Sequence, residues 1–262
     1  MPSLTIVTTA GRPDEKSEEL AKKAADILNI AVVPRKKRSV SRMQKEYNAN
    51  VIVAGKNRYE YYPYSVTEPF FFHPNSAAYR LKRLEKGGTD PLIEVCRLQQ
   101  GDRFLDCTLG LGSDSIVAKY VVGHRGRVVG LEANPNVAFI VKNGLQVYDV
   151  SEMPLAACMR AIEVVQAEAV VYMKELPDNA FDIVYMDPMF ETIIEESDNF
   201  MPLRSAGEKT VITDEWMAEA KRVAKRGVCL KAYFDSPLFF RYGFERDIRL
   251  SSKFHFGFLQ MT

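Results

Sequence analysis

The sequence predicts an α/β protein: a doubly wound, mostly parallel sheet with an antiparallel hairpin at its carboxyl end, preceded by a small α/β module. Strand and helix patterns alternate from residue 103, which is typical of a parallel sheet covered by helices on both faces. After residue 242 apolar and polar residues alternate, as in an antiparallel pair. The charge also changes sign: residues 1–95 carry 16 Lys and Arg against 11 Asp and Glu, and the remainder carries 19 against 23. We therefore expect a module at residues 1–75 and a larger domain at residues 76–262.

Composition is that of a globular protein with a full core. The chain has 262 residues, of which 47% are hydrophobic and 26% are charged. No apolar run approaches the roughly 18 to 20 residues that cross a bilayer, so no membrane partner and a cytoplasmic location are expected. The four cysteines lie far apart without C-x-x-C spacing or a nearby histidine. We interpret them as core residues, and no metal site is expected.

The amino-terminal module shows short strand and helix patterns. We expect strands at residues 4–8, 31–33 and 51–54, and helices at residues 13–28 and 40–47. Residues 56–92 are rich in proline and aromatic residues, which predicts an irregular connector that ends in a helix at residues 76–85.

Basic residues gather in two clusters of this amino-terminal part. One is Arg35-Lys36-Lys37-Arg38 with Arg42, and the other begins at Arg80 and ends at Lys86. Basic clusters interleaved with aromatic residues can follow a phosphate backbone and stack on bases. The alternative is that the clusters are solvated loops and the aromatics form a core or a seam between domains.

The larger domain alternates strands and helices. Expected strands are residues 103–106, 128–132, 163–166, 181–186 and 228–232, and expected helices are residues 114–122, 135–148, 155–161 and 214–225. The closing antiparallel pair is expected from the alternation of Ile248, Leu250, Phe254, Phe256 and Phe258. Trp216, at helical spacing, is expected in the core.

A glycine loop follows the first of these strands. Asp106 ends the strand, Gly110 and Gly112 lie in the loop, and Asp114 follows at the start of a helix. In doubly wound sheets ligands bind beyond the carboxyl ends of the strands, where this turn usually lies. A pyrophosphate fingerprint would need a third glycine, but residue 115 is Ser. Two flanking carboxylates suit an ammonium or a sulfonium group better than a phosphate.

Acidic residues also end the next two strands. Glu132 follows the glycine loop by about twenty residues, where a ribose diol is held in related folds. Glu168 is a candidate acceptor for an adenine amino group. Either carboxylate has a simpler alternative as a helix cap.

The stretch DIVYMDPMF, residues 182–190, closes the fourth strand with Asp187, Pro188 and Phe190. A turn favours proline, but it gains nothing from a phenylalanine at its tip. We predict that the ring stacks on a planar ligand. The alternative is a proline turn in which Asp187 caps a helix and Phe190 packs in the core.

Taken together, these motifs resemble the class I S-adenosylmethionine-dependent methyltransferases, and within them the bacterial small-subunit (16S) ribosomal RNA guanine-N2 methyltransferases. The similarity covers about residues 70–262 and rests on D-x-T-x-G-L-G-x-D from Asp106, E-x-N-P from Glu132 and D-P-M-F from Asp187. Glu191 stands where that family has a final proline. The resemblance implies a seven-stranded class I methyltransferase domain and a ribosomal RNA or small ribosomal subunit as partner.

The resemblance also implies roles for single residues. S-adenosylmethionine would be held by Asp106, Thr108, Gly110, Gly112, Asp114, Glu132 and Glu168. Asp187, Pro188 and Phe190 would be catalytic, and Met189, His73, Arg80 and Lys231 would bind the substrate. An exocyclic amine is a poor nucleophile because its lone pair is delocalised, and hydrogen bonds from its N–H groups to Asp187 and the Pro188 carbonyl would free that lone pair.

Other functions fit parts of the pattern. A methyltransferase of a protein or small molecule would keep the cofactor site but would not need the basic module. A nicotinamide-dependent oxidoreductase shares the doubly wound sheet, although the missing third glycine argues against it. A binding protein with a decayed active site would take up RNA without methylating it. The oligomeric state is not predicted.

Overall fold

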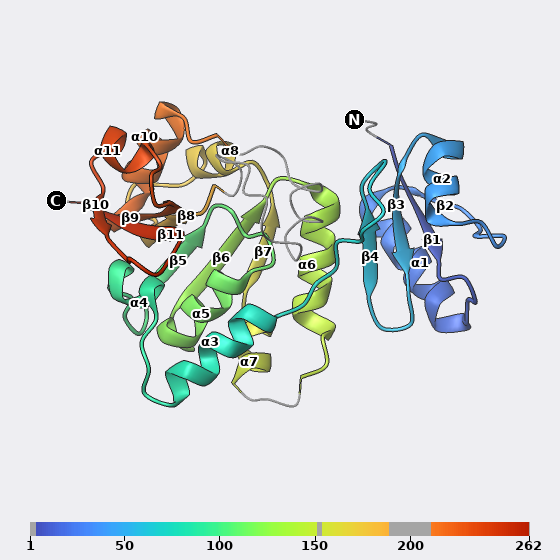
Figure 1. Ribbon diagram of the computed structural model, residues 1–262, viewed down its shortest axis with the longest axis horizontal. Helices are drawn as coiled ribbons and strands as arrows, with labels where there is room; N and C mark the ends of the chain where they lie inside the picture. Colours follow the sequence, from blue (N-terminus) through green and yellow to red (C-terminus); the bar gives the residue numbers. More distant parts are fainter. Residues whose placement is uncertain (1–3, 151–153, 189–210, 262) are drawn as a thin grey trace. The chain divides into compact units, whose positions relative to one another are not determined.

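The computed structural model describes residues 4–150, 154–188 and 211–261 (Figure 1). By its internal packing the chain divides into two compact units. The described residues of the first unit are 4–73 and 134–148, and those of the second unit are 74–133, 149–150, 154–188 and 211–261. Among the described residues, no helix is both long and apolar enough to cross a membrane.

The first unit is a four-stranded sheet with helices. Its elements are β1 (Thr5–Thr9), α1 (Glu15–Leu28), β2 (Ala31–Val32), α2 (Val40–Tyr47), β3 (Asn50–Ala54), β4 (Tyr59–Tyr62) and α6 (Pro135–Val147). The strand order is β2-β1-β3-β4, with β1 parallel to both of its neighbours and β4 antiparallel to β3. Ile6, Met43 and Val51 lie in its buried core.

Strand β4 was not expected, because its tyrosines and the prolines around it suggested an irregular connector. Tyr59 and Tyr61 are buried, whereas Glu60 and Tyr62 are half-buried, so the segment alternates as a strand does. The Tyr59 ring packs edge-on against Phe139 of α6, with 4.8 Å between ring centroids. The aromatic residues of the connector are therefore partly core residues of this unit.

The second unit contains a seven-stranded sheet. Its strands are β5 (Arg103–Asp106), β6 (Arg127–Glu132), β7 (Glu163–Gln166), β8 (Phe181–Met186), β9 (Ala224–Tyr233), β10 (Glu245–Asp247) and β11 (Phe254–Gln260). The order is β10-β11-β9-β8-β5-β6-β7; β5 to β9 are parallel, and β11 is antiparallel to β9 and β10. The predicted doubly wound, mostly parallel sheet with an antiparallel hairpin is confirmed.

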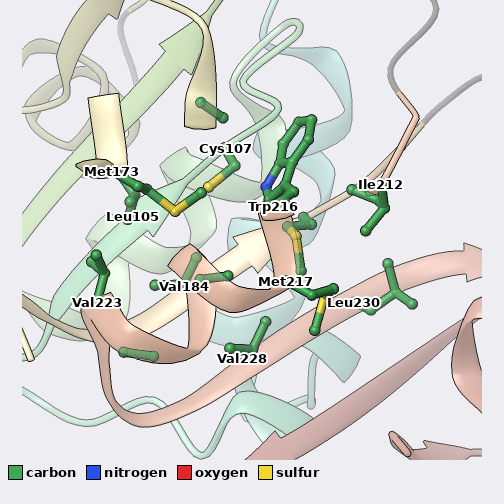
Figure 2. Close-up of a cluster of buried hydrophobic side chains, with 14 of the residues drawn as sticks. Leu105, Cys107, Met173, Val184, Ile212, Trp216, Met217, Val223, Val228 and Leu230 are labelled. Atoms are coloured by element: carbon green, nitrogen blue, oxygen red, sulfur yellow. The ribbon is translucent and has the colours of Figure 1, made fainter. Parts of the chain in front are cut away.

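Helices cover both faces of this sheet. Those of the second unit are α3 (Asn75–Glu85), α4 (Pro91–Cys96), α5 (Ser113–Val122), α7 (Leu155–Arg160), α8 (Ala169–Lys174), α10 (Asp214–Val223) and α11 (Leu238–Tyr242). Helices α3, α4 and α7 pack around α5, and α8 packs with α10. Figure 2 shows the core on the α8 and α10 side, where Trp216 and Met217 of α10 lie near Cys107 and Met173. The expected burial of Trp216 and of the four cysteines is confirmed.

Three details of the second unit differ from the sequence prediction. The short helices α4, α8 and α11 were not expected. Helix α10 ends at Val223 rather than at residue 225, because Ala224 turns to extended backbone and pairs with Phe181 of β8. Ile248 and Leu250 lie outside the hairpin strands and are 61% and 100% exposed, so their alternation did not indicate a buried strand face.

The order of the strands brings two loops together. The chain runs from β5 outward to β6 and β7, and then returns to place β8 on the other side of β5. The connections after β5 and β8 therefore leave the same edge of the sheet at the point where the strand order reverses, which is where open α/β sheets bind their ligands.

Candidate active site

The loop after β5 contains two glycines in the left-handed region. Gly110 has φ 50° and Gly112 has φ 72°, and Gly112 is the N-cap residue of α5. Left-handed backbone costs other residues energy because Cβ crowds the next carbonyl, so both positions favour glycine. The loop thus turns sharply from strand to helix and has no side chains at these two positions.

Asp106 anchors this loop from below. Its side chain accepts hydrogen bonds from the Thr108 N–H at 3.0 Å and from the Ser115 hydroxyl at 2.6 Å. Asp106 is only 1% exposed, and burial raises its pKa to about 7 even though the two hydrogen bonds favour the ionised form. Asp106, predicted to hold the cofactor, is therefore hydrogen-bonded both to the loop at Thr108 and to α5 at Ser115.

Leu109 fixes the loop to the neighbouring strand. It is buried, and its N–H donates to the Leu131 carbonyl of β6 at 2.9 Å. A Cβ added to Gly130 would lie 2.4 Å from Leu109 Cδ1. A Cβ at position 130 of β6 would therefore force the Leu109 side chain, or the loop that carries it, to shift.

The loop is bonded to the end of β8. The Asp187 backbone N–H donates to Thr108 Oγ1 at 2.7 Å, and Pro188, which follows, is buried. The predicted neighbourhood of the glycine loop and the D-P motif is present in the structure. Met189 and Phe190 lie outside the described residues.

A network of charged side chains lies beside these two loops. Lys231 Nζ of β9 lies 2.6 Å from Asp187 Oδ2 and 3.2 Å from Asp114 Oδ2. Asp114 also accepts from Arg80 Nη1 at 2.5 Å and from the Tyr185 hydroxyl at 2.9 Å. Asp114 of α5 therefore binds side chains from α3, β8 and β9.

The network continues from Arg80 to Asp90. The Nε and Nη2 atoms of Arg80 donate to the two carboxylate oxygens of Asp90, both at 2.8 Å, and Asp90 caps α4 by accepting from the Leu92 N–H. This two-pronged geometry is the strong form of an Arg–carboxylate pair. Arg80, predicted to face the substrate, thus also joins α3 to α4 and α5.

Burial and charge act against each other on the ionisable groups of the network. Burial disfavours ionised Asp114, but Lys231 and Arg80 outweigh it, and the Asp114 pKa is lowered. Burial likewise opposes a charged Lys231, yet Asp114 and Asp187 raise the Lys231 pKa. At Asp187 burial prevails over the attraction of Lys231, and its pKa is raised. Asp187 is thus a more basic carboxylate than Asp114.

Glu132 ends β6, and Glu168 lies two residues after the end of the neighbouring parallel strand β7, at the same sheet edge. The Glu132 carbonyl accepts from the Ala167 N–H at 3.1 Å. Glu168 is exposed and precedes α8 without a side-chain capping bond, so the simpler alternative for it is not realised. Their predicted contacts with a ribose and an adenine stay predictions.

His73 belongs to the first unit. Its ring lies edge-on to Phe71, 5.7 Å between centroids, and burial, assisted by Arg58, lowers its pKa. Within the described part of the chain its buried Nδ1 has no hydrogen-bond partner. Its predicted contact with substrate stays a prediction.

Sequence reasoning missed three members of this site: Tyr185, Asp90 and Ser115. Tyr185 stands out only as a polar tip within the apolar run of β8. Asp90 precedes Pro91, which is the sequence signature of a capped helix start. Ser115 was noticed only as an absent glycine. Within residues 4–150, 154–188 and 211–261 there is no group of three or more His, Cys, Asp and Glu placed to bind a metal.

Comparisons with known proteins agree with this geometry. A family model described as "Putative SAM-dependent methyltransferase" matches residues 70–197. The protein YpiP of Bacillus subtilis (strain 168) is 40% identical over 257 residues, covering 98% of this chain and 100% of YpiP. Ribosomal RNA small subunit methyltransferase J of Ectopseudomonas mendocina (strain ymp) is 32% identical over 125 residues, 45% of this chain and 45% of that protein. The solved structure of an S-adenosylmethionine-dependent methyltransferase from Neisseria gonorrhoeae covers 97% of this chain and 95% of its own with a TM-score of 0.58 and 15% identity.

The strand order, the loop geometry and the family model define the class: the chain is a class I S-adenosylmethionine-dependent methyltransferase, and S-adenosylmethionine is its cofactor. Within that class it belongs to the family of Bacillus subtilis YpiP. The Neisseria structure supports the fold alone. The match to methyltransferase J covers less than half of either chain, and it does not by itself assign that enzyme's substrate to this protein.

Proposed function

We infer that the protein transfers the methyl group of S-adenosylmethionine to an exocyclic amine of a nucleobase, guanine N2 of small-subunit (16S) ribosomal RNA. The observation that carries this inference is the bond between Thr108 and Asp187, which holds a carboxylate at the end of β8 beside the glycine loop. The partial similarity to ribosomal RNA methyltransferases supports the choice of RNA. A cytoplasmic location follows from that substrate.

The residues at this edge fit the cofactor chemically. Asp114 and Asp187 bind the cations Lys231 and Arg80, and Arg80 also binds Asp90. Asp106 and Glu132 add two carboxyl groups at the ends of β5 and β6. Such an acidic balance suits a ligand that has a sulfonium and an ammonium group. When bound, S-adenosylmethionine supplies an electrophilic methyl group. We assign the contacts with it to Asp106, Thr108, Gly110, Gly112, Asp114, Glu132 and Glu168.

Within the described residues, one carboxylate oxygen of Asp187 is open to a substrate amine. Lys231 binds Oδ2, and among the described residues no hydrogen bond to Oδ1 is found. An N–H of the amine donating to Oδ1, and the second donating to the Pro188 carbonyl, would localise the nitrogen lone pair. No strong base is needed for this, because the nitrogen is cationic after it gains the methyl group and then releases its proton to water. Holding the nitrogen in line can contribute about 7 to 11 kcal/mol in well-oriented reactions.

Phe190 follows Asp187 in the chain and is assigned to stacking on the base, a contact worth about 1 to 3 kcal/mol in single-stranded complexes. Met189, His73, Arg80 and Lys231 are the further residues that we assign to substrate binding. A base paired or stacked in folded RNA must first be flipped out of its stack.

The test uses labelled cofactor and the natural particle. The protein is incubated with tritiated S-adenosylmethionine and either small ribosomal subunits or naked 16S RNA from a strain that lacks it, and the labelled nucleoside is identified by mass spectrometry. Labelled N2-methylguanosine is the expected result. Label in protein, or in another nucleoside, would contradict the assignment of the acceptor.

Asp187→Ala tests the chemistry separately. We expect loss of transfer with nearly unchanged cofactor affinity, measured by calorimetry. The matched control is Asp182→Ala, because Asp182 is on the same strand but binds the Arg103 backbone N–H rather than the site. If Asp187→Ala transfers methyl groups as fast as the Asp182→Ala control, the proposed role of this carboxylate is wrong.

A further inference from the structure

The turn that follows β2 in the first unit breaks a local rule of backbone conformation. Lys36 has φ 45° and Lys37 has φ 60°, and the Arg38 N–H donates to the Arg35 carbonyl at 3.0 Å. Two consecutive positive φ values are those of a type I′ turn, which strongly prefers Asn-Gly, Asp-Gly or Gly-Gly. Two lysines in these positions are strained, and strain of this kind tends to persist where function requires it.

The arginines on either side hold the turn closed. Arg35 Nε donates to the Arg38 carbonyl at 2.6 Å, and Arg38 Nε donates to the Arg35 carbonyl at 3.2 Å. Arg38 Nη1 also binds Glu46 at 2.6 Å and the Tyr47 hydroxyl at 3.0 Å. The Arg38 side chain is only 12% exposed. The run Arg-Lys-Lys-Arg therefore has two kinds of members: the arginines are structural, and the lysines between them are displayed.

The displayed lysines lie on a turn that Arg38 connects to α2 through Glu46, and α2 has exposed cations of its own. Lys36, Lys37, Arg42 and Lys45 are exposed, and within the part of the chain that the structure describes none of their side chains forms an ion pair. A depression of about 610 Å³ is lined by Ser39, Ser41, Arg42, Lys45 and Glu46. The acidic member, Glu46, is neutralised by Arg38. The surface thus combines uncompensated cations with serine hydroxyls.

We propose that Lys36 and Lys37, with Arg42 and Lys45 of α2, form the surface that binds the phosphate backbone of the RNA substrate. This proposal rests on the proposed function, because the RNA that would bind this surface is the substrate assigned there. Lysine and serine are typical phosphate contacts in nucleic-acid complexes. Lysine is depleted at protein interfaces, and the surface has no exposed aromatic anchor of the kind that dominates them.

The turn offers a variant that removes the charges while improving the fold. Lys36→Asn with Lys37→Gly installs the preferred type I′ pair and should fold at least as well as the parent. The full-length protein is titrated with 16S ribosomal RNA transcribed in vitro at several salt concentrations. Loss of two phosphate contacts should lower the steepness of log affinity against log salt by about 1.4, at about 0.7 per contact with single-stranded RNA.

Two controls separate a specific surface from net charge. Lys36→Arg with Lys37→Arg keeps both cations and should keep parental RNA affinity and salt dependence. Lys22→Gln with Lys23→Gln removes two exposed charges from α1 of the same unit and should change neither. Cofactor affinity, measured by calorimetry, should be the same in all four proteins.

The outcomes are distinct for this surface and for the function on which it rests. The surface assignment is wrong if the Asn-Gly variant binds RNA with the parental salt dependence. It is also wrong if the α1 control loses as much RNA affinity and salt dependence as that variant does. Neither result contradicts methyl transfer to RNA. If the parent protein neither binds nor labels RNA, the proposed function fails and this surface fails with it.

Discussion

The hydroxyl of Thr108 accepts a 2.7 Å hydrogen bond from the backbone N–H of Asp187, and this bond joins segments 79 positions apart in the chain. It links the glycine loop, which leads into α5, to the end of β8. The loop that we assign to the cofactor and the carboxylate that we assign to the amine are therefore joined directly by one hydrogen bond.

Thr108→Val should lower transfer more than it lowers cofactor affinity. Valine keeps the shape but removes the acceptor, and an unpaired buried N–H costs about 1 to 3 kcal/mol. We expect a fall in kcat that is larger than the fall in cofactor affinity, measured by steady-state kinetics and calorimetry. Thr108→Ser keeps the hydroxyl and serves as the control. Equal rates for the two variants would show that the bond does not position Asp187.

Lys231→Met should shift the pH dependence of transfer. Burial raises the pKa of Asp187 and Lys231 lowers it, so removing the ammonium group leaves the Asp187 pKa higher still. Because the proposed role needs an ionised carboxylate, the acidic limb of kcat/KM against pH should move to higher pH. Lys231→Arg keeps the charge and should move it little. A Met variant with the parental pH profile contradicts this role.

Gly130→Ala should displace the glycine loop through Leu109. The new Cβ would meet Leu109 Cδ1 at 2.4 Å, and overpacking of this kind costs about 1 to 3 kcal/mol. We expect lower stability and weaker cofactor binding, measured by denaturant unfolding and calorimetry. Adding Leu109→Ala makes room for the methyl group and should recover part of the loss. If the two changes are simply additive, the loop does not rest on this glycine.

Asp106 should make the protein less stable as the pH rises. Its folded-state pKa is about 7 against an ordinary value of 3.8, because burial disfavours its charge. Its contribution to stability is therefore fully present below the unfolded value and is lost as the pH rises through about 7. In Asp106→Asn, which keeps an acceptor for Thr108 but cannot ionise, the loss should be absent. Urea unfolding of both proteins at about pH 5 and about pH 8 measures this difference; parallel changes would refute it.

Local patterns were sufficient to predict most strands of the second unit. The predicted bounds of β5, β7 and β8 are those of the structure: residues 103–106, 163–166 and 181–186. Each is a short apolar run between polar turns, a pattern that indicates a strand. The tyrosines of β4 were misread because Pro63 follows them directly and further prolines come soon after. The extended backbone at Ala224 was also missed, since pairing with Phe181 overrides the helical pattern there.

The charge network could not be read from the chain. Asp114 was predicted as a ligand-facing acid, but its partners Arg80, Tyr185 and Lys231 are distant in sequence, and nothing local pairs them. Similarly, Arg35 and Lys36 are both basic residues in the sequence. Only the backbone angles and hydrogen bonds of the turn show that Arg35 holds the turn closed and that Lys36 is displayed. The sequence shows where charged residues cluster. Which of them form ion pairs depends on contacts between residues that are distant in the chain.

Trp216, the chain's one tryptophan, packs in the core of the second unit near Cys107, at the base of the glycine loop. Its emission therefore reports on that unit alone, while far-ultraviolet circular dichroism sees both. Coincident melting curves from the two signals would mean that the units unfold as one cooperative block, and separated curves would give each unit its own unfolding midpoint without any label being attached.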